Sequence, residues 1–480
     1  MFDGYIRDYA SWTPRALAVV TPQRRVSYAD FDADIDRFGA VISQLGIDRS
    51  TGVVSICLDS PYLTLVALAA LGRLRVVSAP YNDPGAALRL IERDGAGRDA
   101  PGPRLVKLEP DGLAAMRGAE PRPLPYLPIA PDDTGRVMLS SGTTRAPRRV
   151  ALSWRRIEMC NHAALRSYAN GARGTWAPLI TVETTMGLTM ALAAWSVGAA
   201  VTGGIGNAEL PELMETAPPG IIGCTPVQLR GLLALAPADL APRPGWRIVT
   251  GGALLPLSLA REARLRLTPD VRILYGATEA SINTVGLASD LEEHPGLVGR
   301  CPTGARLEIV DDTGGPVPDG VSGEIRITGA RMSPGYLDDP AATAERFRDG
   351  WFHTHDVGRR LPDGRVILEG RLDDRMNLGG RKFMPADLEE AAFAFAGVLD
   401  AAAFAVPGPT GMDQCWLAVA AAADFDRDGL AARLAGDRNL PMVHFAWIDE
   451  VPRNAMGKVE RPRLRDAVLA AIGRPSKPAG

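Results

Sequence analysis

The fold is decided by residues 53–79, which read VVSICLDSPYLTLVALAALGRLRVVSA. The apolar run at 53–58 predicts a buried strand, Pro61 opens an apolar helix, and residues 75–79 predict the next strand. Two strands joined by a helix must lie parallel, because the crossover carries the chain back along the sheet. This stretch therefore predicts a parallel α/β sheet.

The same alternation extends to both sides. Apolar residues spaced three and four apart predict a helix over 28–45, with Ser27 as its N-cap. Residues 93–134 are rich in glycine, proline and charge and predict surface connections, apart from a short strand at 105–108. Helices and strands alternate again over 137–289, so a doubly wound α/β class is expected.

The chain changes character at residues 304–369. Pairs such as Ile325 and Ile327 alternate with polar residues, and Gly/Pro turns separate the segments. This pattern predicts a small antiparallel sheet or distorted β-barrel. A polar stretch near Arg371 precedes a fresh mixed series, so we expect a large domain at 1–371 and a smaller α+β domain at 372–480.

Length and composition set limits. The 480 residues exceed what one hydrophobic core usually supports. A net charge of −3 leaves no electrostatic footprint for nucleic acid or a membrane surface. The five cysteines form no Cys-x-x-Cys pair, the first residues lack a signal-peptide pattern, and the apolar runs are too short to span a bilayer. A soluble cytoplasmic protein is expected.

The first segment with chemistry is 140–150, SSGTTRAPRRV, directly after an apolar strand. Small residues let a ligand approach the backbone, hydroxyl and amide groups can donate to phosphate oxygens, and the arginines add positive charge. The spacing of a Walker loop is absent. Phosphate binding and a polar turn in a basic patch both remain open.

The second segment is Tyr275-Gly-Ala-Thr-Glu279, at the end of a predicted strand, where open α/β sheets bind ligands. Tyr275 could stack on a base, Thr278 could donate to a phosphate, and Glu279 could hold Mg²⁺. The alternative is an ordinary strand-to-helix turn with Glu279 near a helix N-terminus.

Two further segments carry polar groups. Asp356 could accept both hydroxyls of a ribose, and Arg371 could donate to the same sugar. A metal site of His353, His355 and Asp356 is a weaker interpretation. Lys458 follows a glycine in a proline-punctuated loop that could carry its ammonium to a site; a solvated surface lysine is the alternative.

In this order the four segments resemble the adenylate-forming (AMP-binding) superfamily of acyl-CoA synthetases, stand-alone nonribosomal adenylation domains and luciferases. Further stretches agree, among them Gly251-Gly-Ala, Gly335-Tyr336 and Gly370-Arg-Leu-Asp-Asp374. The resemblance covers nearly the whole chain.

The resemblance implies a role for each matching residue. The nucleotide site would comprise Ser141, Gly142, Thr143, Thr144 and Arg148 at the phosphates, Gly252, Ala253, Tyr275 and Gly276 near the adenine, and Asp356 and Arg371 at the ribose. Thr278 would meet the α-phosphate, Glu279 the Mg²⁺, and Lys458 both the carboxylate and the nucleotide. Asp373 would be the hinge, Gly380 would line a thiol tunnel, and Thr181, Glu183 and Gly276 would line the acid pocket.

The implied function is an ATP-dependent carboxylic acid ligase that forms an acyl-adenylate and passes the acyl group to a thiol. Coenzyme A is the leading candidate for this thiol. The alternative acceptor is the pantetheine of an acyl carrier protein, an amine or another nucleophile. Two other classes are a nucleotide-binding module without catalysis and a dinucleotide-dependent oxidoreductase. The latter rests on Gly204-Ile-Gly206, which lacks the third glycine.

Four residues depart from the family pattern: Arg145 and His355 replace glycines, and Arg148 and Asn377 replace lysines. Glu183 suggests a separate hypothesis, since an acidic group near the acid pocket would favour an amino-bearing substrate. The alternative is that Glu183 faces solvent or pairs with an arginine.

Overall fold

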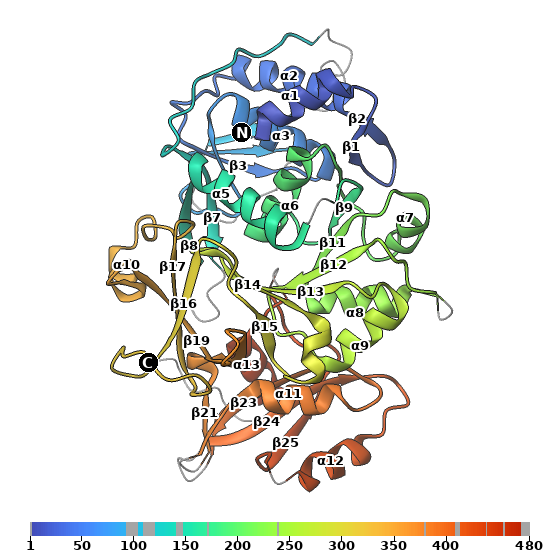
Figure 1. Ribbon diagram of the computed structural model, residues 1–480, viewed down its shortest axis with the longest axis vertical. Helices are drawn as coiled ribbons and strands as arrows, with labels where there is room; N and C mark the ends of the chain where they lie inside the picture. Colours follow the sequence, from blue (N-terminus) through green and yellow to red (C-terminus); the bar gives the residue numbers. More distant parts are fainter. Residues whose placement is uncertain are drawn as a thin grey trace.

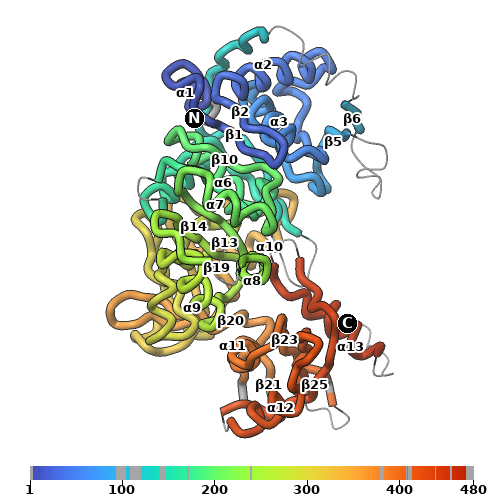
Figure 2. Tube along the Cα trace, turned by 90° about the vertical axis from the view of Figure 1, so that its right-hand side faces the viewer, coloured from blue at the N-terminus to red at the C-terminus, as the bar shows by residue number. Residues whose placement is uncertain are grey.

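The computed structural model describes residues 2–92, 104–108, 121–140, 147–169, 172–237, 240–378, 381–408, 413–437, 439–454 and 457–471. A large lobe forms most of the molecule, and a smaller lobe from the last hundred residues stands against one end of it (Figures 1 and 2). Within this described part, no helix combines the length and apolarity needed to cross a bilayer.

The first sheet contains the stretch that predicted the fold. Its strands in spatial order are β6 (Arg104–Lys107), β5 (Leu88–Ile91), β3 (Val53–Cys57), β4 (Val77–Ala79), β7 (Thr134–Ser140) and β8 (Arg148–Ser153). All neighbours are parallel except β7 and β8. The predicted strand–helix–strand unit is present, with α3 (Pro61–Arg73) as the crossover.

The second sheet has eight strands. In spatial order they are β14 (Ser281–Leu287), β13 (Val271–Ala277), β12 (Arg247–Gly251), β11 (Ile221–Cys224), β9 (Thr175–Pro178), β10 (Ala200–Thr202), β1 (Leu17–Val20) and β2 (Arg25–Ser27). The strands from β13 to β1 are parallel, and β14 and β2 are antiparallel edges. Both sheets confirm the expected doubly wound class.

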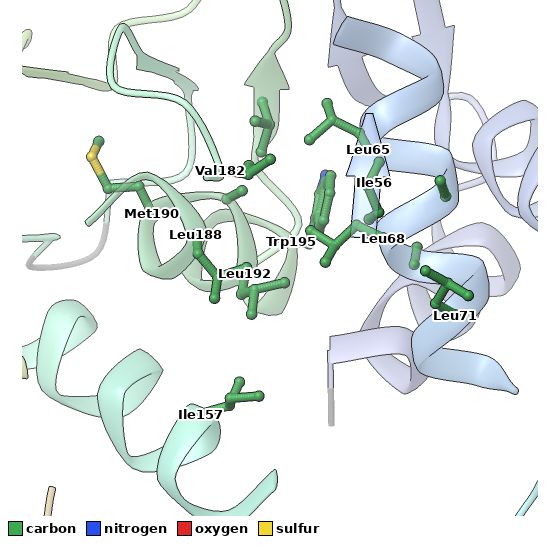
Figure 3. Close-up of a cluster of buried hydrophobic side chains, with 14 of the residues drawn as sticks. Ile56, Leu65, Leu68, Leu71, Ile157, Val182, Leu188, Met190, Leu192 and Trp195 are labelled. Carbon is green, nitrogen blue, oxygen red and sulfur yellow. The ribbon is translucent and has the colours of Figure 1, made fainter. Parts of the chain in front are cut away.

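Helices fill the space between the two sheets. Leu65 and Leu68 of α3 lie toward Trp195 of α6 (Thr185–Ser196), as Figure 3 shows, and Leu71 and Leu192 belong to the same buried cluster. The Trp195 indole N–H donates to the Ala18 carbonyl at 3.1 Å, so this large side chain is buried without losing its polar contact.

The large lobe contains further helices. They are α1 (Phe2–Trp12), α2 (Tyr28–Gln44), α5 (Trp154–Ala164) with its continuation η1 (Leu165–Ala169), α7 (Leu210–Thr216), α8 (Pro226–Leu235), α9 (Leu257–Arg266) and α10 (Pro340–Arg346). The predicted cap of α2 is confirmed, because Asp30 N–H donates to the Ser27 hydroxyl at 3.1 Å.

The third sheet takes the place of the expected small barrel. Its antiparallel strands are β15 (Leu297–Gly299), β20 (Val366–Arg371), β19 (Trp351–Arg360), β17 (Gly323–Gly329) and β16 (Ala305–Val310), with β18 (Phe347–Arg348) beside β19. It brings Asp356 of β19 to Tyr275 of the second sheet, and Arg371 of β20 lies beside Asp356.

The small lobe is an α+β unit. It contains the hairpin β21 (Met376–Leu378) and β22 (Arg381–Phe383), the sheet β23 (Val398–Pro407), β24 (Asp413–Ala421) and β25 (Val443–Trp447), and the helices α11 (Pro385–Phe393), α12 (Arg427–Gly436) and α13 (Arg461–Ala471). The buried clusters divide at the same place: those of the large lobe reach Ile367, and those of the small lobe begin at Met376.

Candidate active site

A cavity of about 200 Å³ lies between the two lobes. The large lobe supplies the ends of β12 and β13 and parts of β19 and β20, and the small lobe supplies the loop before α13. The predicted site residues that line it are Gly252, Ala253, Tyr275, Gly276, Asp356, Arg371 and Lys458. Carboxyl ends of parallel strands are where open α/β sheets bind ligands, so the position agrees with the topology.

Asp356 is held from two sides. The Tyr275 hydroxyl donates to its Oδ2 at 2.7 Å, and the Arg371 guanidinium donates to its Oδ1 at 3.1 Å. Burial, followed by the neighbouring carboxylate, raises the pKa of Tyr275 well above its ordinary value, so the phenol remains a proton donor. The structure thus brings Tyr275 to Asp356 and Arg371, which are partners on neighbouring strands.

Thr278 and Glu279 lie in a three-residue turn between β13 and β14. The alternative interpretation as a strand-to-helix turn is wrong, because the chain continues as an antiparallel strand. Gly276 is required by this hairpin: a Cβ there would lie 2.5 Å from the Ser281 carbonyl oxygen. Neither Thr278 nor Glu279 lines the cavity, although the charge of Glu279 acts on Lys458.

Glu279 is a buried carboxylate with one engaged oxygen. The Tyr336 hydroxyl donates to its Oε1 at 2.7 Å, and the guanidinium of Arg148 lies 5.1 Å from the centre of the Tyr336 ring. The sequence indicated Tyr336 as part of a matching stretch, but it did not indicate this contact. Among the described residues, Oε2 of Glu279 makes no hydrogen bond.

Thr278 is fixed by its backbone. Its carbonyl accepts from the buried Arg156 guanidinium at 2.6 Å, and its hydroxyl accepts from Thr185 at 3.3 Å. Neither partner was expected from the sequence, because each belongs to a helix distant in the chain.

Lys458 enters the cleft from the small lobe. Its main-chain N–H donates to the Asn454 side chain at 3.1 Å, and Gly457 turns the loop with φ of +72°. Burial lowers the pKa of the ammonium, whereas the charges of Asp356 and Glu279 oppose that shift. Within the described part of the chain, Nζ makes no hydrogen bond or ion pair. The lysine is therefore a cation near two carboxylates, available to a ligand.

The small lobe docks through α11. The Leu257 N–H, at the start of α9, donates to Glu390 Oε1 at 2.9 Å. Pro256 precedes that helix and provides no side-chain cap, so the other lobe supplies it. The Arg230 guanidinium lies 4.5 Å from the centre of the Phe393 ring. These contacts hold Lys458 in the cleft.

Several predicted residues lie outside the described part. They are Ser141, Gly142, Thr143, Thr144 and Arg145 of the expected phosphate loop, and Gly380 of the expected thiol tunnel. The loop joins Ser140 of β7 to β8, and Arg148 at the start of β8 lies 3.5 Å from Asp339.

The acid-pocket candidates are not equivalent. Thr181 is exposed. Glu183 accepts from the Tyr81 N–H at 3.0 Å; burial raises its pKa, while the buried Arg136 opposes that shift. The Glu183 carboxylate therefore interacts with the charge of Arg136. This favours the alternative of pairing with an arginine over the hypothesis that Glu183 recognises an amino-bearing substrate.

His355 lies beside the expected hinge. Its Nδ1 is 3.7 Å from Asp373 Oδ2, and its φ of +56° is left-handed. Glycine adopts this conformation without strain, which explains why a glycine is usual at this position. His353 instead pairs with Glu324 at 3.0 Å. Asn377 lies in β21.

Together, the doubly wound lobe, the strand-end cleft and a lysine from a second lobe define a nucleotide-binding enzyme of two lobes. The model of the AMP-binding enzyme family matches residues 91–337, more than half of the chain. The chain belongs to this family, as the motifs predicted.

Known relatives extend over the whole chain. A 3-hydroxybenzoate/4-hydroxybenzoate–CoA ligase from Thauera aromatica is 26% identical, over 97% of this chain and 96% of the relative. ATP-bound MatB from Rhodopseudomonas palustris has a TM-score of 0.83 at 23% identity, covering 97% and 99% of the two chains. The amide bond synthetase McbA from Marinactinospora thermotolerans has a TM-score of 0.80 at 22% identity, covering 97% and 100%. These two structures confirm the expected fold.

Proposed function

We propose that this chain is an ATP-dependent carboxylic acid ligase that forms an acyl-adenylate, releases pyrophosphate and transfers the acyl group to coenzyme A. The observation that carries the proposal is Lys458, which reaches from the small lobe into the cleft near Asp356 and Glu279. The name of the Thauera relative, a CoA ligase, supports the same class.

The first step activates the substrate carboxylate, which is a poor electrophile, by attaching AMP as a leaving group. A substrate carboxylate oxygen attacks the α-phosphorus of ATP, the bond to the bridging oxygen breaks, and pyrophosphate leaves. Asp356 and Arg371 bind the ribose, Gly252, Ala253, Tyr275 and Gly276 surround the adenine, and residues 141–144 with Arg148 bind the outer phosphates. Thr278 donates to the α-phosphate, and the Lys458 ammonium offsets the charge that grows on the reacting oxygens.

Glu279 is the residue that would hold Mg²⁺. A carboxylate is the oxygen ligand that this ion prefers, and Tyr336 fixes one oxygen while the other is available. The ion would supply positive charge at the phosphates.

The second step uses a different lobe arrangement. Residues 1–371 and 372–480 form the two bodies, and the small lobe turns about Asp373 after adenylation. Rotation removes Lys458 from the cleft and brings the segment around Gly380 to line the path of the thiol. The lobes meet through α11, so the cost of separation is mainly that interface.

An alternative acceptor is an amine or a carrier-protein pantetheine. The similarity to an amide bond synthetase supports an amine as one of the alternative acceptors. Both acceptors share the adenylation step.

The test has two stages. Exchange of labelled pyrophosphate into ATP is measured across aryl, fatty and amino acids, and dependence on one acid establishes adenylation. The purified chain is then given that acid with ATP and coenzyme A, a carrier protein or an amine. Absence of exchange with every acid would refute adenylation; exchange without thioester would refute coenzyme A as acceptor.

A further inference from the structure

A second cavity, of about 700 Å³, lies beside the second sheet and shares no lining residue with the cleft. Its walls come from α5 and η1, the far end of β14, and the segments that follow β15 and β17. Arg272 pairs with Leu287 in the β13–β14 hairpin, whereas Tyr275 pairs with Thr284 nearer the turn. The cavity is thus at the opposite end of this hairpin from Thr278 and Glu279.

The wall of this cavity is strongly positive. Its charged lining residues are Arg166, Arg272, Arg300, Arg331, Arg365 and Asp290. The lining therefore contains five arginines and one aspartate, in a chain whose net charge is −3. Convergent arginines attract and orient anions.

Two of these arginines have no carboxylate partner among the described residues. Arg331 is 5% exposed and donates to the carbonyls of Thr303 and Ile282 at 3.1 and 3.2 Å. Arg166 is exposed at the rim, and within the described part of the chain its side chain makes no hydrogen bond or ion pair. A buried cation without a counter-charge is unfavourable, so an anion bound here would compensate it.

The other arginines are partly neutralised by neighbours. Arg272 lies 2.9 Å from Asp270, and Arg365 lies 2.6 Å from Asp363. Arg300, 3.4 Å from Asp363, is exposed at the rim. The positive charge without a partner is therefore at the buried wall, where Arg331 lies, and at the rim, where Arg166 lies.

We infer that this cavity binds an oxyanion group, carboxylate or phosphate, of a small molecule. Guanidinium groups donate to either through paired N–H groups. One source is the far end of an acid substrate with a second anionic group. Arg331 connects the cavity to the catalytic turn, because its carbonyl accepts from Arg156, which also donates to Thr278. The other source is a free phosphate-bearing anion. The first source rests on the proposed function; the second does not.

The test variant is Arg166→Glu, and Arg49→Glu is its matched control. Both side chains are exposed, both changes alter the charge equally, and Arg49 lies outside both cavities. Arg300→Glu at the same rim repeats the test.

In the first arm, inorganic pyrophosphate is titrated calorimetrically into the full chain. Pyrophosphate is also expected to bind in the cleft, so the difference between the two variants is the measure. If the anion is free, one binding component weakens about tenfold in Arg166→Glu and is unchanged in Arg49→Glu.

About 20 Å of strand separates Arg272 from Thr278, so the second arm uses diacids of that length. Pyrophosphate exchange compares tetradecanoate with tetradecanedioate and hexadecanoate with hexadecanedioate. If the acid supplies the anion, Arg166→Glu raises KM for the diacids about tenfold and leaves the monoacids unchanged. Identical behaviour of the two variants in both arms would overturn the inference. If no acid supports exchange in the native chain, the proposed function fails, while the calorimetric arm still decides the cavity.

Discussion

The two sides of the cleft hold their functional groups in different ways. On the large lobe, Asp356 is bonded to Tyr275 and Arg371 by side chains, so its position is fixed. On the small lobe, Lys458 is held by the main chain of its own loop, and its ammonium has no partner among the described residues. One side is fixed by side-chain hydrogen bonds, and the other presents an ammonium without such a partner among the described residues.

The strongest test of this contrast is Lys458→Ala. Loss of a preorganised cation is expected to reduce adenylation by about 10²–10³-fold or more, while thioester formation from a supplied adenylate is retained. Pyrophosphate exchange and single-turnover transfer measure the two steps. Lys107→Ala, in β6, is the control. Equal loss of both steps would mean that Lys458 does not act in one lobe arrangement alone.

The same residue predicts an alkaline limb. Burial lowers the pKa of Lys458, and the role proposed for this residue requires the protonated ammonium. Adenylation is therefore present at lower pH and lost as pH rises through this lowered pKa, below the ordinary lysine value of about 10.4. Lys458→Arg should remove the limb, because a guanidinium stays charged. An unchanged limb in that variant would assign it to another group.

Asp356→Asn tests the fixed side. The substitution preserves shape but removes the charge that Arg371 contacts at 3.1 Å. It also removes one of the two oxygens proposed to accept the ribose hydroxyls. KM for ATP is expected to rise about 10–100-fold, which corresponds to about 1.4–2.8 kcal/mol. Steady-state kinetics with Asp312→Asn, an exposed carboxylate, as control give the comparison. An unchanged KM would exclude Asp356 from the nucleotide site.

Tyr336→Phe tests the second fixed contact. It removes the hydroxyl that donates to Glu279 Oε1 and leaves the ring beneath Arg148. Without this hydrogen bond the Glu279 carboxylate is less well oriented, because partners of a metal ligand orient that ligand. The Mg²⁺ concentration needed for half-maximal pyrophosphate exchange is therefore expected to rise about fivefold. Tyr81→Phe, an exposed tyrosine, is the control. An altered maximal rate with an unaltered Mg²⁺ dependence would contradict this positioning role.

Glu390→Ala tests the docking of the lobes. The cap that Glu390 gives to α9 is expected to contribute about 1 kcal/mol, so adenylation falls about fivefold while transfer from a supplied adenylate is unchanged. Exchange and single-turnover assays measure this, with Glu345→Ala on exposed α10 as control. A fall in both steps would indicate general destabilisation instead of lost docking.

Local patterns predicted most of the fold and part of the site. The spacing in residues 53–79 and the cap at Ser27 report on neighbours in the chain, and those elements are confirmed. Lys458 and Asp356 were found through their motifs, and the structure brings them to one cavity. Their roles remain predictions.

Contacts between distant segments could not be predicted in this way. The Tyr336–Glu279 bond joins residues 57 positions apart, and the Glu390 cap spans 133. The arginine-lined cavity collects its wall from residues as far apart in the chain as Met159 and Arg365. Such contacts depend on tertiary packing, which periodicity and turn chemistry do not encode.

The smallest expected effect concerns His355, which lies beside Asp373, the proposed hinge residue. His355→Gly should relieve a left-handed residue with φ of +56°, which costs about 1 kcal/mol or more, although glycine also makes the unfolded chain freer by about 0.4–1 kcal/mol. The pair with Asp373 at 3.7 Å is partly exposed and contributes little. Calorimetry should therefore show Tm unchanged or raised by about 1–2 °C near neutral pH.

The difference in Tm between His355→Gly and the native protein is small, but its dependence on pH is a more decisive test. Burial lowers the pKa of His355, so the unfolded chain binds this proton more tightly than the folded protein. The native protein therefore loses stability as pH falls through the unfolded value of about 6.5, and the glycine variant does not share that loss. The gain in Tm should be larger at pH 5.5 than at pH 8. The opposite order would mean that protonated His355 stabilises the fold through Asp373. A side-chain contact of the large lobe would then also hold the proposed hinge residue.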